Sequence, residues 1–272
     1  MASYTTGDSG MTRQSFMASK LSLKNKVTVV TGGSRGIGLD LAESTADLGS
    51  DVVLMDIREP QTDLKELATK YKTRFKFYHT DVTEMTSLQA SFDRCVNDLG
   101  KIDNCITAAG VAMDKPFLDH TWDECRKLLD VNVLGSFFCA QLAARQMKEQ
   151  QTGGSIVMIA SIAAHCAIPA QRVSMYGGTK AAIKLLGQTL GAELAPLNIR
   201  VNTVSPGFIA TDMSKQFTEL QDVFRNVPPL GRIGETGDLA MAVAYFLCSG
   251  SSYTTGADLA VTGGLHNGRI EL

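Results

Sequence analysis

The residue types that could move a proton lie in one stretch, Tyr176-Gly177-Gly178-Thr179-Lys180, with Ser161 upstream. Positions i and i+4 of a helix share a face, so the lysine ammonium would lie close to the tyrosine phenol. A free phenol has a pKa of about 10, and a nearby cation favours its charged form. We therefore expect Lys180 to lower the pKa of Tyr176 and to make this phenol a proton donor or acceptor. Ser161 could hydrogen-bond a substrate oxygen, or it could serve only as a turn residue or helix cap.

A glycine-rich turn near the N-terminus could bind phosphate. It follows a β-branched run at 27–30, and its glycines fall at positions 32, 36 and 38. Such a turn lets the backbone approach a pyrophosphate, and the helix that follows directs free N–H groups at the charge. The spacing is G-x-x-x-G-x-G rather than the standard G-x-G-x-x-G, so taken alone it also fits an ordinary turn.

The elements that would position these residues alternate along the chain. Strands are expected over 27–30, 51–56, 75–78, 102–106, 155–160, 199–204 and 259–261, and helices over 36–48, 62–71, 85–99, 121–148, 174–194 and 236–249. This alternation predicts an α/β fold with one doubly wound parallel sheet of about seven strands and helices on both faces. We expect residues 1–20 to form a disordered tail and residues 21–272 one domain, in which the irregular, apolar segment 208–230 acts as a lid.

Composition excludes several classes of function. The chain of 272 residues has a formal net charge of −2, which argues against nucleic-acid binding. It has no apolar run of the roughly 18 residues needed to span a bilayer, and its first twenty residues contain no apolar signal core. The six cysteines form no C-x-x-C pair and the four histidines are isolated, so we expect reduced thiols, no metal site and a cytoplasmic location.

An acid and two arginines bear on the choice of nucleotide. Asp56 lies about twenty residues beyond the glycine turn, where an acid can hydrogen-bond a ribose 2′-hydroxyl and repel a 2′-phosphate. Arg35 and Arg58 could instead pair with that phosphate, or they could be ordinary solvent-exposed loop residues. We expect NAD(H) to be favoured, with NADP(H) as the alternative.

Six short motifs occur together in one order, and this combination resembles the short-chain dehydrogenase/reductase family over about residues 21–266. The motifs are Thr31-Gly-Gly-Ser-Arg-Gly-Ile-Gly38, Asp81, Asn132-Val133-x-Gly135, Ser161, Tyr176-x-x-x-Lys180 and Pro206-Gly207. The resemblance implies a Rossmann fold and an NAD(P)-dependent oxidoreductase that interconverts a secondary alcohol and a ketone by hydride transfer. It also implies a homotetramer, or a homodimer, built on the long helices.

The resemblance also implies four catalytic roles. Tyr176 would be the general acid in reduction and the base in oxidation, and Lys180 would hold the nicotinamide ribose and lower the pKa of the phenol. Ser161 would orient the substrate oxygen. Asn132 would anchor a water that links Lys180 to solvent, although an asparagine here could also simply kink a long helix. Cofactor contacts would come from Gly32, Ser34, Arg35, Gly36, Ile37, Gly38, Asp56, Asp81, Val82, Ala108, Ala109, Gly110, Tyr176, Lys180, Pro206, Gly207, Ile209 and Thr211.

One segment departs from the family pattern. After the fourth strand the family usually has Asn-Asn-Ala-Gly, whereas this chain has Thr107-Ala108-Ala109-Gly110. The missing second asparagine normally ties adjacent strands together. We therefore expect some loss of rigidity but retained cofactor binding.

The substrate pocket is expected to use His165, Gln171, Phe208 and Met213. His165 and Gln171 could bind hydroxyl groups, and the pattern is similar to family members acting on polyols and ketoses, although His165 could equally face solvent at the rim. The alternatives are a ketoreductase of secondary metabolism, a non-catalytic nicotinamide-binding scaffold, and a non-redox reaction that uses the cofactor as structure.

Overall fold

Seven short strands form one parallel sheet in the order β3-β2-β1-β4-β5-β6-β7. The computed structural model describes residues 13–168, 170–215 and 218–268. The strands are β1 (Val27–Thr31), β2 (Asp51–Asp56), β3 (Phe75–His79), β4 (Asn104–Thr107), β5 (Gly154–Ile159), β6 (Ile199–Pro206) and β7 (Asp258–Val261). The predicted doubly wound sheet is confirmed, and each strand begins and ends within a few residues of its expected position.

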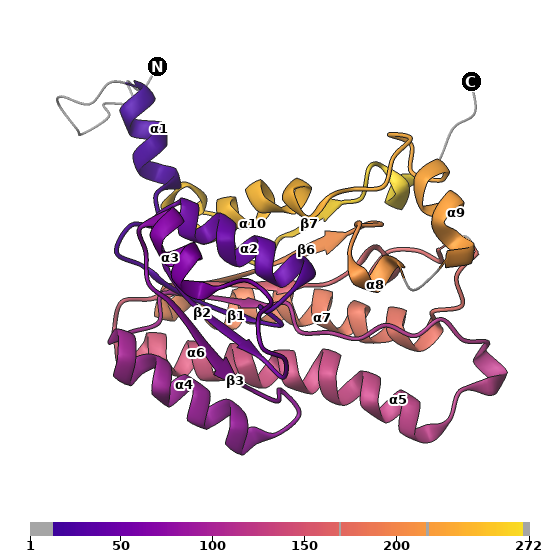
Figure 1. Cartoon of the computed structure of the whole chain (residues 1–272), viewed down its shortest axis with the longest axis horizontal. Coiled ribbons are helices and arrows are strands. Elements are labelled where there is room, and N and C mark those ends of the chain that lie inside the picture. The colour runs from indigo at the N-terminus through magenta and orange to yellow at the C-terminus, as the bar shows by residue number, and fades with distance from the viewer. Residues whose placement is uncertain (1–12, 169, 216–217, 269–272) are drawn as a thin grey trace.

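Helices cover both faces of this sheet. They are α1 (Arg13–Leu21), α2 (Gly36–Asp47), α3 (Leu64–Tyr71), α4 (Met85–Leu99), α5 (Trp122–Leu129), α6 (Ser136–Glu149), α7 (Ser174–Glu193), α8 (Asp212–Lys215), α9 (Gln221–Asn226) and α10 (Ala240–Leu247). Short 3-10 turns are η1 (Phe117–Asp119), η3 (Ile162–Ala164), η4 (Ala195–Leu197), η5 (Thr218–Leu220), η6 (Thr236–Leu239), η7 (Ser249–Ser251) and η8 (Leu265–Asn267). Figure 1 shows α2, α3 and α10 on one side of the sheet and α4, α6 and α7 on the other.

Two hydrophobic clusters fill the space between the sheet and its helices. Val29 and Met55 belong to the cluster beneath α4, α6 and α7, while Val30 and Leu54 belong to the cluster beneath α2, α3 and α10. Successive strand residues point to opposite faces, so a strand buried on both faces must be apolar at nearly every position. The β-branched runs in the sequence meet this requirement.

The strand order reverses between β1 and β4, which are neighbours although two strands separate them in the sequence. From β1 the chain proceeds through α2 to β2, whereas β4 continues through α5 and α6 to β5 on the other side. The crossovers diverge there and leave a crevice at the carboxyl ends of the strands. Thr31 pairs with Thr107 at this point, so the glycine turn and residues 108–110 leave the sheet side by side.

The expected helix over 121–148 is interrupted by a π-helical turn. Thr121 and Glu124 form the predicted capping box at its start. Asp130–Gly135 then forms the π turn η2, which separates α5 from α6. A Cβ on Gly135 would lie 2.8 Å from Val82 Cγ2, so the helix passes close to the loop after β3. A π turn contains an extra residue per turn and is often found at functional sites.

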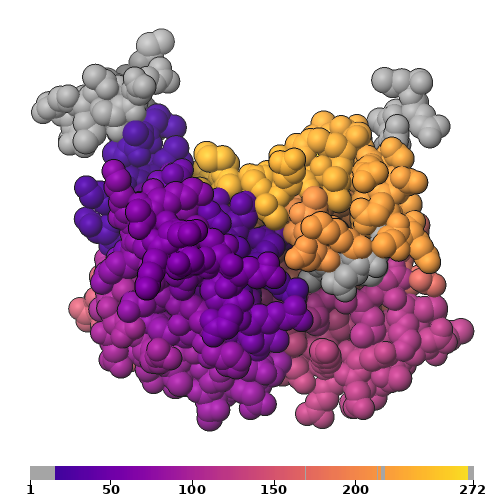
Figure 2. Space-filling view, viewed as in Figure 1, coloured from indigo at the N-terminus to yellow at the C-terminus, as the bar shows by residue number. Residues whose placement is uncertain are grey.

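Two segments contain more regular structure than the sequence indicates. Residues 13–20 were expected in a disordered tail but belong to helix α1, whose Lys20 carbonyl accepts a hydrogen bond from Ser249 Oγ at 3.3 Å. Residues 1–12 lie outside the described part of the chain. The segment 208–230 contains α8, η5 and α9 rather than irregular backbone alone, and in Figure 2 its orange surface faces the purple N-terminal half. No helix among the described residues is long and apolar enough to cross a membrane.

Candidate active site

Two clefts meet at the carboxyl ends of the central strands. The larger has a volume of about 620 Å³ and runs over the glycine turn and the ends of β2 and β3. The smaller, of about 160 Å³, lies between β5, α7 and the 208–230 segment. Both are lined by Ile37, Ala108, Gly110, Val111 and Thr211, so they form one continuous site. Every predicted cofactor residue except Ser34 lines one of the two.

The glycine turn is built so closely that two of its glycines have no room for a side chain. Gly32 has φ +67°, and a Cβ there would lie 2.7 Å from the Ala109 backbone. A Cβ on Gly38 would lie within 2.1 Å of the Gly32 carbonyl oxygen. The turn therefore packs against the segment after β4, and its backbone is left exposed to the larger cleft.

The residues of this turn fit the pyrophosphate of a nicotinamide dinucleotide. Helix α2 begins at Gly36 without a side-chain cap and without an acid in its first turn, so its first N–H groups are free to bind an anion. The Ser34 hydroxyl is buried and has no hydrogen-bond partner among the described residues. A buried polar atom without a partner is unusual. Because Ser34 lines neither cleft, the fit to the pyrophosphate rests on the free N–H groups of α2 rather than on this hydroxyl.

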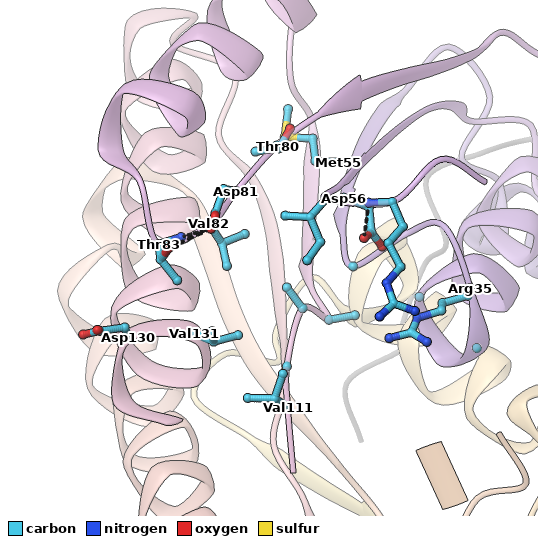
Figure 3. A pocket seen from close by; sticks show the side chains of 18 of the residues that line it. Arg35, Met55, Asp56, Thr80, Asp81, Val82, Thr83, Val111, Asp130 and Val131 are labelled. Atoms are coloured by element: carbon cyan, nitrogen blue, oxygen red, sulfur yellow. Dashed lines mark hydrogen bonds between the residues drawn. The ribbon is translucent and has the colours of Figure 1, made fainter. Parts of the chain in front are cut away.

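The end of β2 presents one acid and two arginines to the same cleft. Asp56 Oδ2 accepts a hydrogen bond from the Ser34 backbone N–H, and Oδ1 accepts one from the Arg58 backbone N–H, both at 3.1 Å. Arg35 and Arg58 line the cleft, and neither forms an ion pair with a described residue. Figure 3 shows Arg35 and Asp56 on the same wall.

The loop after β3 forms the opposite wall. Asp81 Oδ1 accepts hydrogen bonds from the Thr83 backbone N–H at 2.9 Å and from Thr83 Oγ1 at 2.7 Å, which fixes the loop. In Figure 3, Val82 and Val131 lie one above the other on this wall, across the cleft from Asp56 and Arg35. Together they provide an apolar slot next to a carboxylate, which is the environment that an adenine ring requires.

Ser161 and Tyr176 are brought together at the mouth of the smaller cleft. Ser161 lies two residues beyond the end of β5 and caps η3, its Oγ accepting a hydrogen bond from the Ala163 backbone N–H at 3.1 Å. The close packing of α7 on this turn depends on Gly177, where a Cβ would lie 3.0 Å from the Ala163 carbonyl oxygen. Burial raises the pKa of the Tyr176 phenol, and a hydrogen bond with Ser161 acts in the opposite direction.

Lys180 lies one helical turn beyond Tyr176, with its Nζ 5.9 Å from the centre of the phenol ring. It donates a hydrogen bond to the Ile159 carbonyl oxygen at 2.9 Å, and burial lowers its pKa to about 8. The predicted lowering of the Tyr176 pKa by Lys180 is therefore wrong for this structure. Burial is the main cause, because desolvation penalises the phenolate just as it penalises the Lys180 ammonium.

Asn132 is completely buried in the π turn. Its Nδ2 donates to the Val111 carbonyl oxygen at 2.9 Å and to Thr179 Oγ1 at 3.0 Å, and its Oδ1 accepts from the Val111 N–H at 2.9 Å. The side chain thus ties the loop after β4 to the helix that carries Tyr176 and Lys180. A Cβ on Gly110 would lie 3.3 Å from Asn132 Oδ1 and 3.5 Å from Lys180 Nζ, so Gly110 keeps the space between them open. The water relay through Asn132 stays a prediction.

The departure at 107–110 has a local compensation. The Ala108 backbone N–H donates to the Thr31 carbonyl oxygen at 3.1 Å, and the Ala109 N–H lies 3.5 Å from Thr31 Oγ1. Thr31 thus supplies part of the link that the missing asparagine would make. The buried Thr107 hydroxyl has no partner among the described residues.

The predicted substrate residues separate into two groups. Gln171 and Phe208 line the smaller cleft as expected. His165 does not line either cleft; it follows η3 directly, and its side chain contacts Lys184 and Asp258 instead. Met213 belongs to α8, but its side chain lies outside the described part of the structure.

Several lining residues were missed by sequence reasoning. Val111 and Ala112 continue the segment after β4, a position that strand-end reasoning could have included. The others are apolar residues near β5 and α7 and in the segment 208–230, one serine of that segment, and charged residues of α5: Ile162, Val173, Phe224, Ser214, Asp123, Arg126 and Lys127. No sequence signal marks these, because their place depends on how separate elements pack.

Comparison with known proteins agrees with this geometry. Residues 32–266 match the family profile described as enoyl-(acyl carrier protein) reductase. A sorbose reductase of Schizosaccharomyces pombe is 36% identical over 253 residues, which are 91% of this chain and 98% of the relative. An NADP-dependent mannitol dehydrogenase of Hypocrea jecorina is 32% identical over 249 residues, 89% of this chain and 93% of the relative.

A solved structure supports the same assignment. The NADPH-dependent 3-quinuclidinone reductase of Rhodotorula rubra superposes with a TM-score of 0.87 and 31% identity, covering 97% of this chain and 99% of that one. The sheet order, the glycine turn and the Ser161, Tyr176 and Lys180 arrangement are what the sequence motifs led us to expect. On this evidence the chain belongs to the short-chain dehydrogenase/reductase family.

Proposed function

We propose that this NAD(P)-dependent oxidoreductase reduces an uncharged ketone, a ketose or another small ketone, to a secondary alcohol with NADPH. The observation that carries the proposal is the meeting of Ser161, Tyr176 and Lys180 where the two clefts join. When bound, the nicotinamide supplies the hydride that reduces the carbonyl carbon. The protein must then hold the carbonyl oxygen and deliver one proton to it.

The phenol of Tyr176 is suited to donate that proton. Burial raises its pKa, so the group keeps its proton at neutral pH and acts as an acid toward a carbonyl oxygen. Ser161 Oγ would hold the same oxygen, and Lys180 would bind the ribose hydroxyls and return a proton to the phenol. Its pKa of about 8 is close enough to neutrality for this exchange.

The preference for NAD(H) that Asp56 suggested is not supported by the comparisons, since the relatives that name a nucleotide are NADP-dependent. The geometry offers a reason. Asp56 is occupied by two backbone N–H groups, so its charge is partly compensated. Arg35 and Arg58 line the cleft without an acidic partner among the described residues, and we assign the 2′-phosphate of NADP(H) to them.

The smaller cleft indicates the substrate class. Lys180 is the one charged side chain among its described lining residues, and Gln171, Thr211 and Ser214 are the polar ones beyond the catalytic groups. Most of the other walls are apolar, including Ile168 and Phe208. Lys180 would be taken up by the ribose hydroxyls, so a carboxylate or phosphate on the substrate would find no further cationic partner among these residues, whereas a hydroxyl beside the carbonyl could bind to the Gln171 amide.

The test is a panel of substrates assayed with the purified protein and NADPH. The panel should contain sorbose, fructose, a bicyclic amino ketone such as 3-quinuclidinone, and a keto acid of similar size. We expect turnover of at least one neutral ketone and little or none of the keto acid. Tight NADPH binding with no turnover across the panel would favour the scaffold alternative.

We also propose that the protein is a homotetramer, or a homodimer, that associates through α5 and α7 in the cytoplasm. Large apolar side chains are exposed on and next to these helices: Leu118 is 90% exposed, Trp122 81% and Leu185 63%. Apolar area of this kind is characteristic of an interface. Light scattering coupled to size exclusion would give the mass directly.

The cysteines bear on the proposed cytoplasmic location. All six are free thiols, which fits a reducing compartment.

A further inference from the structure

His165 has contacts that neither catalysis nor substrate binding explains. Its Nδ1 lies 3.1 Å from Lys184 Nζ, and its Nε2 lies 2.9 Å from Asp258 Oδ2. The Nε2–H is not aligned with this oxygen, so the second contact is electrostatic rather than a well-formed hydrogen bond. The His165 side chain is 16% exposed and that of Asp258 only 6%, so the imidazole and the carboxylate interact with little screening by solvent.

Asp258 is itself fixed to the sheet. Its Oδ1 accepts hydrogen bonds from Ser205 Oγ at 2.8 Å and from Thr203 Oγ1, both on β6. The imidazole therefore contacts a carboxylate whose position is set by β6 and β7. On its other side it contacts α7, because Lys184 lies on that helix one turn beyond Lys180.

His165 ends the turn that carries Ser161. The turn η3 starts directly after Ser161, and the His165 backbone N–H closes it by donating to the Ile162 carbonyl oxygen at 2.8 Å. The side chain of His165 thus joins this turn to α7 and to the sheet. Any shift of the turn would change the separation of Ser161 and Tyr176, which lie on the two elements that His165 connects.

The contact with Lys184 requires one protonation state of the ring. A lysine ammonium can only donate hydrogen bonds, so Nδ1 must accept and the single ring proton must be on Nε2, facing Asp258. If the ring gains a second proton, an Nδ1–H faces the ammonium and the contact becomes repulsive. The other titratable group facing the ring is His266 of η8, whose ring centre is 6.0 Å away and whose Nδ1 lies 2.6 Å from Thr262 Oγ1.

We propose that neutral His165 is a positioning residue that sets the place of Ser161 relative to Tyr176 through Lys184 and Asp258. The inference rests on the proposed role of Ser161 in holding the substrate oxygen. It replaces the expected role of His165 in binding substrate hydroxyls.

Two substitutions of His165 test this inference. His165→Phe keeps the ring volume but removes both polar contacts, and we expect kcat to fall roughly tenfold to a hundredfold, the usual cost of a small misplacement of catalytic groups. The KM for NADPH should stay within about twofold, since His165 does not line the nucleotide cleft. His165→Asn keeps an acceptor near Lys184 but does not titrate, and it should retain most of the wild-type kcat at pH 8.

The split between kcat and KM separates positioning from a merely structural role. His165→Phe should lower kcat and leave the KM for NADPH unchanged, and His165→Asn should restore kcat. The control His79→Asn removes an exposed imidazole at the opposite edge of the sheet and should leave both constants unchanged.

A kcat of His165→Asn as low as that of His165→Phe would overturn the inference, as would an unchanged kcat in His165→Phe. Thermal melting checks that each variant is folded, and His165→Asn remains informative if His165→Phe is not. A wild-type protein without turnover on the ketone panel would instead refute the proposed function, and this inference with it.

Discussion

Removing Arg35 or Arg58 should weaken the binding of NADPH but not that of NADH. A charge-assisted hydrogen bond contributes about 1.5–3 kcal/mol. Both side chains are exposed, so solvent screening reduces this to about 1–2 kcal/mol each. Since 1.4 kcal/mol corresponds to tenfold, Arg35→Ala and Arg58→Ala should each raise the KM for NADPH about 5- to 30-fold. The double variant should cost about 2–3 kcal/mol, less than the sum, because the two groups share one phosphate.

The assay is the initial rate of NADPH and of NADH oxidation with the best ketone of the panel, followed by the absorbance of the reduced nicotinamide. Arg126→Ala is the matched control, because Arg126 lines the same cleft from α5 but already has an acidic partner: its Nε lies 3.7 Å from Asp130 Oδ2. We expect the ratio of the two KM values to be unchanged in this control. Equal increases of both KM values in the Arg35 and Arg58 variants, or no increase of either, would refute the assignment of the phosphate.

Two further predictions concern the catalytic elements. Asn132→Ala removes three hydrogen bonds of a fully buried side chain and leaves the Val111 N–H and carbonyl without this partner, although Thr179 Oγ1 keeps its bond to the Tyr176 carbonyl oxygen. The free energy of unfolding measured in urea should therefore fall by about 2–4 kcal/mol, and a loss below about 0.5 kcal/mol would contradict this role. Lys180 has a folded-state pKa of about 8 against 10.5 unfolded, so the unfolded chain binds more protons between these values and stability rises with pH there. Lys180→Met should therefore have a higher free energy of unfolding than wild type at pH 7, by about 2–3 kcal/mol at most. If this difference does not narrow as the pH rises from 8 to 10.5, the lowered pKa of Lys180 is contradicted.

The features that sequence reasoning predicted well are those set by spacing along one element. The glycines at 32 and 38 and the pair Tyr176 and Lys180 belong to a single turn and a single helix, so their order in the chain fixes their relative placement. The strands were predictable because burial on both faces of a parallel sheet demands long apolar runs. The crevice followed from the strand order that these runs imply.

The features that were missed depend on contacts between distant segments. The position of the His165 side chain depends on the 3-10 turn before it and on its contact with Asp258, almost a hundred residues later in the chain. The pKa of Tyr176 depends on burial by several elements, and a count of neighbouring charges could not include that cost. The π turn around Asn132 has no spacing signal, since it accommodates contacts to Val111 and Thr179.

The account depends most on the proton carried by one phenol at the junction of the two clefts. The direct measurement is single-turnover ketone reduction by Tyr176→Phe, with NADPH affinity determined on the same sample by fluorescence titration. The account predicts a loss of at least about a hundredfold in the rate of the chemical step, with the NADPH dissociation constant within about threefold of wild type. A Phe variant that reduces the ketone at the wild-type rate would contradict it.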